Sequence, residues 1–194
     1  MVRKNPISEI NKRVEHFIQH DLPRIAGKMG EDEFRENFHR EGFRNNGIRP
    51  WPEVKRRKKD SPWYGFQYKG ERRTSVAVRK DKKTGKYMRS KKQRKLNFSQ
   101  AATQRRILTG PDSNLMNSIR VREASPGRVV IGTDLPYAEV HNEGGYIRIF
   151  GKKKVKVPRR QFIGESRELM DELEKALLER VDAIVDSITD TSDH

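Results

Sequence analysis

The stretch SRELMDELEKALLERVDAIVDSI, residues 166–188, is the most regular part of the sequence. Apolar side chains recur in it every three or four residues, which is the spacing of one face of an α-helix. That face comprises Leu169, Leu173, Leu177, Val181, Ile184 and Ile188, with Met170 and Leu178 beside it. Because an apolar helix face must be buried against another element, we predict a C-terminal helix from about Glu165 that covers the preceding structure.

The region before this helix is typical of short β-strands joined by Pro and Gly turns. LMNSIRVRE leads into a strand, SPGR is a turn, and VVIGT, YAEVHN, YIRIF and KKVKV supply four more strands. Short strands separated by such turns favour an antiparallel meander. We therefore predict an α+β fold, in which a small antiparallel β-sheet is covered by the long C-terminal helix.

Two N-terminal helices are predicted as well. Asn5 is suited to cap the first helix and Pro6 to occupy its first position. The apolar residues that follow at helical spacing are Ile7, Ile10, Val14, Phe17 and Ile18. Asp21 and Pro23 mark a boundary, after which a second helix extends from about Pro23 to Arg40.

The net charge of +16 is concentrated in the middle of the chain. Residues 49–106 contain 21 Lys and Arg against four acids, whereas residues 165–194 contain ten acids against three basic residues. Val76 and Val78 alternate with polar residues, Thr84-Gly85 suits a turn, and Tyr87 resumes the pattern. We predict an extended basic arm or hairpin, with a solvated or disordered insertion as the alternative. The single domain then consists of N-terminal helices (1–44), the basic arm (45–106) and the β-sheet with the C-terminal helix (107–194).

The composition excludes several classes of site. The chain has no cysteine, which excludes disulfides and cysteine-ligated metals. At 32% hydrophobic and 36% charged residues, we expect a modest core with long solvated parts. The N-terminal residues lack an apolar signal segment, and no run approaches the roughly 18 apolar residues of a membrane span. We expect a protein that is soluble in the cytosol where it is made.

The best candidate for catalysis lies in VIGTDLPYAEVHNEGG, residues 130–145, where His141, Asn142 and Glu143 are adjacent. In a strand His141 and Glu143 would share a face and Asn142 would not. The nearest further candidates are Asp134 and Glu139 in the same segment, and no second motif with metal-ligand spacing follows. A metal-dependent nuclease built on His141 is one hypothesis. A polar strand end before a Gly-Gly turn is the interpretation we prefer.

Other motifs for chemistry are weak. His16 and His20 lie one helical turn apart, a spacing that can bind zinc, but no Glu follows His16 as in zinc proteases. No Gly-rich phosphate loop and no nucleophile elbow occurs in the sequence. We predict no catalytic residues, no metal site and no cofactor.

Binding is the remaining class. The basic block is interleaved with aromatic residues that could stack on bases while the cations track phosphates. These are Trp51, Trp63, Tyr64, Phe66, Tyr68 and Tyr87. The same block could instead bind the acidic tail of a neighbouring copy, which would favour head-to-tail association into rings. The residues alone leave both interpretations open.

Four motifs in order resemble those of the phage virion morphogenesis family, the tail-completion proteins that include the G-like protein of phage Mu. They are FHREGFRNNGIRPWPEVKRRK, ILTGPDSNLMNSI, VVIGTDLPYAEVHNEGG and VPRRQFIGES, the last ahead of a final helix, and together they span roughly residues 38–185. The last motif departs from the family pattern, with Arg160 and Gln161 where the family usually has Arg and Pro. The resemblance implies a non-catalytic structural protein of the virion neck that joins a finished tail to a filled head as a ring.

The resemblance also implies roles for individual residues. Thr109-Gly110 and Gly144-Gly145 would fix turns, Tyr137 and Val140 would pack, and Phe162 and Ile163 would seat the C-terminal helix. The expected partners are other copies of the chain, neck, adaptor, portal or tail-terminator proteins, and packaged DNA through the basic arm. The expected location is the neck or tail of the virion. The assembly residues we predict are Trp51, Arg56, Arg57, Lys58, Lys59, Thr109, Gly110, Tyr137, His141, Gly144, Gly145, Arg159 and Phe162.

Overall fold

The computed structural model describes residues 5–67, 78–80, 83–85, 87–89, 97–110, 112–149 and 153–189. The chain forms two compact units, one made of residues 1–52 and 113–194 and the other of residues 53–112. Helices, small antiparallel sheets and a long C-terminal helix confirm the predicted α+β class. Part of the predicted basic arm lies outside the described residues, namely residues 68–77, 81–82, 86 and 90–96, which include Tyr68 and Val76.

The first unit begins with a helical run that includes α1 (Pro6–His16), η1 (Phe17–Asp21) and α2 (Leu22–Arg40). As predicted, Asn5 caps α1, and its side chain accepts a hydrogen bond from the backbone N–H of Ile7 at 3.1 Å. The predicted boundary at Asp21 and Pro23 is instead a π-helical turn, so the chain stays helical there. Pro23 lacks a backbone N–H, and the wider turn before it accommodates this missing donor.

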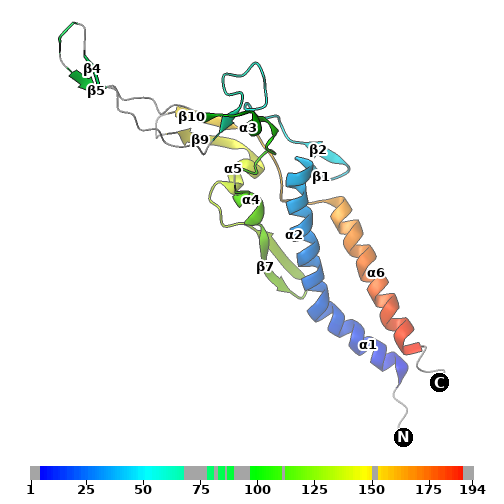
Figure 1. The fold of residues 1–194 in the computed structure, drawn as a ribbon. Helices are drawn as coiled ribbons and strands as arrows, with labels where there is room; N and C mark the ends of the chain where they lie inside the picture. The colour runs from blue at the N-terminus through cyan, green and yellow to red at the C-terminus, as the bar shows by residue number, and fades with distance from the viewer. Residues whose placement is uncertain are drawn as a thin grey trace. The chain divides into compact units, whose positions relative to one another are not determined.

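The C-terminal helix α6 (Arg167–Thr189) lies alongside α1 and α2, as Figure 1 shows. Its apolar face buries Leu169 and Ile188. Helix α2 contacts α6 on one side and packs on its other side against the hairpin of β7 (Arg120–Ser125) and β8 (Arg128–Gly132). Gly30 permits this close approach, because a Cβ atom there would collide with the side chain of Ile131. Helix α2 is therefore the central layer of this unit, between α6 and the β7–β8 hairpin.

The strands pair two by two, and among the described residues they do not form the single meander that we predicted. In the first unit the pairs are β1 (Gly42–Arg44) with β2 (Ile48–Pro50), β7 with β8, and β9 (Gly145–Ile149) with β10 (Lys153–Val157). The second unit pairs β3 (Phe66–Gln67) with β6 (Asn97–Phe98), and β4 (Val78–Lys80) with β5 (Tyr87–Arg89). The β4–β5 pairing agrees with the turn predicted at Thr84-Gly85.

Three short helices complete the fold: α3 (Gln100–Gln104), α4 (Asn114–Asn117) and α5 (Ala138–Glu143). Helix α5 corrects the sequence analysis, which predicted a strand for YAEVHN. No other strand pairs with this segment among the described residues, and Ala and Glu favour a helix. His141 and Glu143 therefore do not share a face, whereas Tyr137 and His141 do, with ring centroids 6.1 Å apart.

The second unit is held together by arginine side chains. The guanidinium of Arg56 donates to the carbonyls of Ala102, Arg105 and Arg106 at 2.7–3.1 Å. That of Arg57 donates to the carbonyl of Arg105 at 2.8 Å. Ser99 caps α3 by accepting a hydrogen bond from the N–H of Ala102. The two arginines thus stabilise the loop that follows α3.

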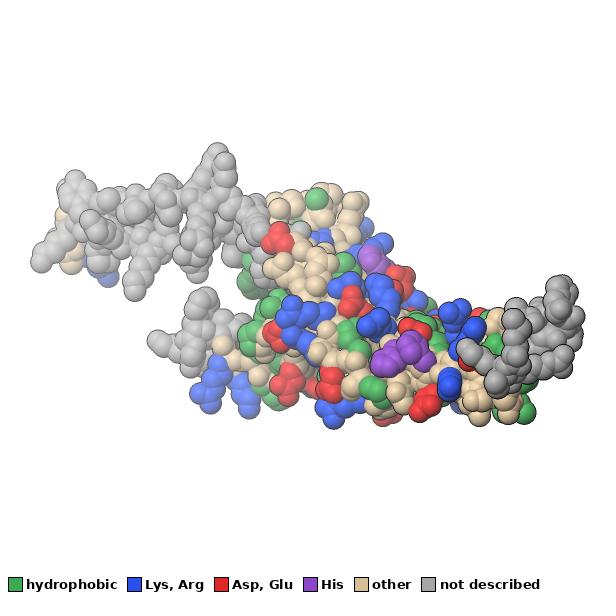
Figure 2. All heavy atoms as spheres, turned by 90° about the horizontal axis from the view of Figure 1, so that it is seen from below, with side chains coloured by type: hydrophobic (Ala, Val, Ile, Leu, Met, Phe, Trp, Pro, Cys, Tyr) green, Lys and Arg blue, Asp and Glu red, His purple; other side chains and the backbone are tan. Residues whose placement is uncertain are grey.

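Charges of both signs are mixed on the N-terminal helices. Ion pairs one helical turn apart join Arg13 to Glu9 at 3.2 Å and Lys28 to Asp32 at 2.7 Å. Figure 2 shows lysine and arginine side chains interspersed with acidic ones over one face of the described residues.

The turn between β1 and β2 is tied to α6 by one carboxylate. Glu168 accepts hydrogen bonds from the backbone N–H groups of Gly47 at 2.7 Å and Asn46 at 3.1 Å. These backbone donors, first of all Gly47, lower the pKa of Glu168 below its ordinary value. The charged form of Glu168 therefore stabilises the fold.

We expect Glu168→Gln to lower the free energy of unfolding at neutral pH, because the amide is a weaker acceptor than the carboxylate. A carboxyl group with a depressed pKa contributes stability above its unfolded value and loses it as the pH falls through the folded value. The deficit of the variant should shrink below pH 4.5, the ordinary glutamate value. Urea unfolding across this range measures it, with the exposed Glu174→Gln as control. A deficit independent of pH would contradict the assignment.

Candidate assembly scaffold around residues 160–163

The segment Arg160–Ile163 is held by side chains from three distant parts of the first unit. The indole N–H of Trp51 donates to the carbonyl of Gln161 at 2.7 Å. The amide of Asn37 donates to the carbonyl of Phe162 at 3.2 Å, and that of Asn142 donates to the carbonyl of Ile163 at 3.1 Å. Three consecutive backbone carbonyls therefore each receive a side-chain donor.

Asn142 makes the largest number of these bonds. Its side-chain oxygen accepts from the N–H groups of Phe162 at 2.8 Å and Ile163 at 3.0 Å. Its amide nitrogen donates to the carbonyl of Ile163 and to the carboxylate of Glu143. An asparagine side chain offers two acceptor and two donor positions, so Asn142 uses all four.

An aromatic cluster packs under this segment. Phe38 and Phe162 are almost fully buried, with ring centroids 5.2 Å apart. The ring of Trp51 meets Phe38 edge-on at 5.4 Å. The indole of Trp51 thus has an apolar body in the core and its N–H on a backbone carbonyl.

Arg160 and His141 join α5 to the same segment. The N–H of Arg160 donates to the carbonyl of His141 at 2.8 Å, and its buried guanidinium donates twice to the carbonyl of Pro52 at 2.8 and 3.0 Å. His141 is half-buried, and its Nδ1 has no hydrogen-bond partner among the described residues. Burial, followed by the positive charge of Arg160, lowers the pKa of His141. These effects favour the neutral form of His141, which lies beside the Arg160–Ile163 segment.

Gly144 links α5 to β9 in a conformation that suits glycine alone. Its backbone has φ 76° and ψ −176°, and a Cβ atom would lie 2.9 Å from the backbone nitrogen of Arg159. The positive φ values of Gly144 and Gly145 agree with the turn predicted there. The base of the β9–β10 hairpin is therefore fixed against the 160–163 segment.

The structure divides the predicted assembly residues into two groups. Trp51, Thr109 and Phe162 are buried, and Arg56 and Arg57 donate to backbone carbonyls within their unit. Lys58, Lys59 and Arg159 are exposed, and Tyr137 is 41% exposed. Gly110 has a positive φ of 54°, in agreement with a turn. The roles of Asn37 and Asn142 were not predicted from the sequence, because a single asparagine that binds backbone groups has no spacing signature.

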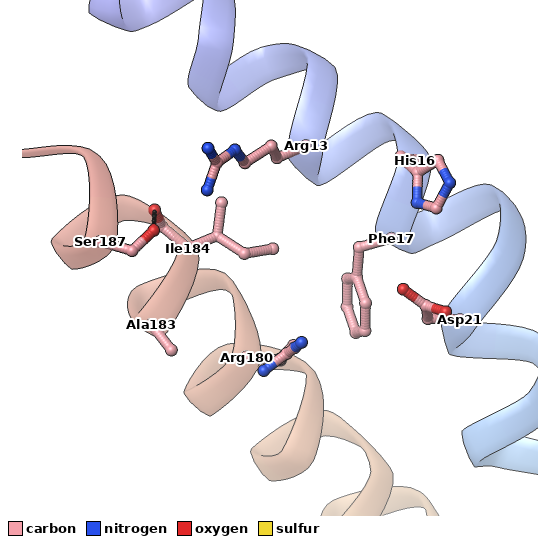
Figure 3. Close-up of a pocket in the computed structure, with 8 residues that line it drawn as sticks. All are labelled: Arg13, His16, Phe17, Asp21, Arg180, Ala183, Ile184 and Ser187. Carbon is pink, nitrogen blue, oxygen red and sulfur yellow. Dashed lines mark hydrogen bonds between the residues drawn. The ribbon is translucent and has the colours of Figure 1, made fainter.

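Hollows also occur between the helices of the first unit. One of about 380 Å³ lies between α1–η1 and α6 (Figure 3), where Arg13 and Phe17 face Ile184 across the gap. An apolar hollow of about 550 Å³ is lined by α2, the β7–β8 turn and α6.

Among the described residues, no group of three or more His, Asp or Glu is arranged to hold a metal ion. None of the described helices could span a membrane.

We expect Asn142→Ala to destabilise the protein by about 2 kcal/mol or more, because it removes the partners of two N–H groups and one carbonyl of the 162–163 backbone. Asn114→Ala is a matched control, since the exposed Asn114 side chain makes no such bonds, and it should change stability by less than about 0.5 kcal/mol. Urea unfolding measures both. Equal effects would show that the Asn142 bonds contribute nothing.

Gly144→Ala should cost about 2 kcal/mol or more, because the new Cβ meets backbone as well as an unfavourable φ. Gly127 also has a positive φ, of 73°, but open space around it. Gly127→Ala should therefore cost only about 1 kcal/mol. Thermal or urea unfolding compares the pair, and similar losses would mean that the contact with Arg159 places no constraint on residue 144.

A comparison with protein families supports the resemblance found in the sequence. Residues 65–182 match the model of the phage virion morphogenesis family, a span that includes β3, all of α5 and most of α6. The first quoted motif, FHREGFRNNGIRPWPEVKRRK, lies before the matched span. No curated protein and no solved structure matches the chain. With more than half of its length matched, the chain belongs to the phage virion morphogenesis family.

Proposed function

We propose that this protein is a structural component of the phage virion that completes the tail and joins it to the filled head at the neck. Its membership of the virion morphogenesis family supports a role in building the particle. The main support for a non-catalytic role is that polar side chains of residues 141–143 contact other parts of the same chain. Asn142 is fully hydrogen-bonded to the 162–163 backbone, and Glu143 contacts Asn142 and Arg159. The bonds of Asn142 support the fold, which favours a structural role for this cluster.

Ring assembly is the second part of the proposal. The basic block of residues 49–106 and the acidic residues 165–194 provide opposite charges on one chain. Contact between two different patches on identical subunits is heterologous, and such contacts close into rings when the rotation allows. Exposed lysines of the second unit, Lys55, Lys58 and Lys59, fit this role better than Arg56 and Arg57, which bind backbone carbonyls.

Exposed acids on α6 are the proposed counterpart. Asp171, Glu174 and Asp182 lie exposed on this helix, separate from Glu168 and Glu172, which bind the β1–β2 region. Attraction between exposed lysines and these carboxylates would orient one copy against the next. A neck, adaptor or portal protein with an acidic surface would be recognised by the same lysines.

A phage from which this protein is removed should accumulate full heads and unattached tails, visible by electron microscopy. Supplying the triple variant Lys55→Glu, Lys58→Glu and Lys59→Glu should not restore joined particles, because the attraction becomes repulsion. The control triple Lys12→Glu, Arg24→Glu and Lys28→Glu makes the same charge change on the N-terminal helices and should restore joining.

Joined particles in the absence of the protein would refute tail completion. Equal restoration by both triples would refute the role of the arm lysines. If the arm triple instead mainly lowered affinity for DNA, with a steep salt dependence, the alternative function of nucleic-acid binding through residues 49–106 would be favoured.

A further inference from the structure

The β9–β10 hairpin has two chemically different faces. In its register Tyr146 pairs with Lys156, and Arg148 pairs with Lys154. Directly opposite residues in an antiparallel pair lie on the same face, so these four side chains share one face. All four are exposed, with Tyr146 at 59%. The other face is apolar: it carries Ile147, which is 39% exposed, Val155, which is half-buried, and Val157, which is 8% exposed.

The exposed face, defined by Tyr146, Arg148, Lys154 and Lys156, is a basic surface without acids. Residues 144–164 contain seven Lys and Arg and no Asp or Glu. None of the three cations on this face has a carboxylate partner within the part of the chain that the structure describes. The ammonium of Lys154 lies 4.5 Å from the ring centroid of Tyr146, which orients it along the face.

This arrangement differs from the solvated helix surfaces of the same molecule. On α1 and α2, several cations pair with acids one turn away, as in Arg13 with Glu9 and Lys28 with Asp32. Cations that are held together without acids repel one another, and an external polyanion relieves that repulsion. Binding of an external anion to the hairpin face is therefore electrostatically favourable.

We propose that this face of the β9–β10 hairpin binds the phosphates of duplex DNA. A two-stranded β-ribbon fits the major groove of B-DNA, and successive pairs on one face are about 7 Å apart at about 3.4 Å per residue. Protein interfaces are depleted in lysine at their centre and anchored by apolar or aromatic side chains. Here three of the four exposed side chains are cations, and the one aromatic ring lies beside Lys154, so phosphates are the better match.

The base of the hairpin is packed and hydrogen-bonded to other parts of the first unit. Gly144 lies against the backbone of Arg159, and the N–H of Arg160 donates to the carbonyl of His141. Val157 is buried at the end of β10. The cations are thus presented on an ordered support, which lowers the entropy cost of binding. The proposal goes beyond head–tail joining and does not depend on ring assembly, because it rests on the hairpin of a single copy.

The test uses the purified full chain and a fluorescent duplex, with the dissociation constant measured by anisotropy over a range of salt concentrations. The triple variant Arg148→Gln, Lys154→Gln and Lys156→Gln should weaken binding at least about tenfold at low salt. It should also reduce the magnitude of the salt slope by about 2.7, or about 0.9 for each phosphate that the variant no longer neutralises. Lys12→Gln, Arg24→Gln and Lys28→Gln remove the same charge from the N-terminal helices and form the control.

Three results would overturn the proposal. One is a hairpin triple that binds DNA with the affinity and slope of the control triple. Another is a loss of affinity confined to Lys55→Gln, Lys58→Gln and Lys59→Gln, which would place the contact in the second unit. The third is an altered oligomeric state of the hairpin triple with unchanged DNA binding, which would make the face a protein interface. Circular dichroism and urea unfolding check that each variant is folded, and none of these readouts depends on head–tail joining.

Discussion

The hydrogen bonds of Asn142 to the 162–163 backbone are the interaction on which the first unit depends. A segment that passes over a core must find partners for its N–H and C=O groups, because unpaired buried backbone groups are costly. Here the partners are side chains: Trp51, Asn37 and Asn142 each bind one carbonyl. The segment precedes α6 and follows β10, so fixing it also fixes where the C-terminal helix and the β9–β10 hairpin begin.

Local patterns in the sequence were sufficient for the long elements. Helical periodicity predicted α1, α2 and α6, and turn residues predicted the hairpins at Gly127 and Gly85. The segment of α5 was predicted wrongly, because its alternating polar and apolar residues were given more weight than the helix preference of Ala and Glu. Its conformation is set by what it contacts: the carbonyl of His141 and the side chain of Asn142 must both reach the 160–163 segment. Such long-range requirements leave no local pattern.

The same reasoning explains why residue types that are common in active sites occur in this part of the fold. His, Asn, Arg and Glu are useful in active sites because they form directed hydrogen bonds, and a scaffold needs those bonds too. Arg160 illustrates this, since its guanidinium is buried and donates twice to the carbonyl of Pro52. In this chain the side chains of Asn142 and Arg160 bind backbone groups. The aromatic cluster of Phe38, Trp51 and Phe162 lies beside the 160–163 segment.

The number of cations in a segment does not by itself show how many can bind a partner, because some are already bound within the chain. The net positive charge is concentrated in residues 49–106, which have 21 Lys and Arg against four acids, yet the guanidinium groups of Arg56 and Arg57 already bind backbone carbonyls. The β9–β10 hairpin has fewer cations, but Arg148, Lys154 and Lys156 stand on one exposed face with no carboxylate bound to them among the described residues. A polyanion gains most where cations are free and already held in place, because it then displaces no internal partner and orders no flexible chain. The less charged hairpin can therefore be the stronger site.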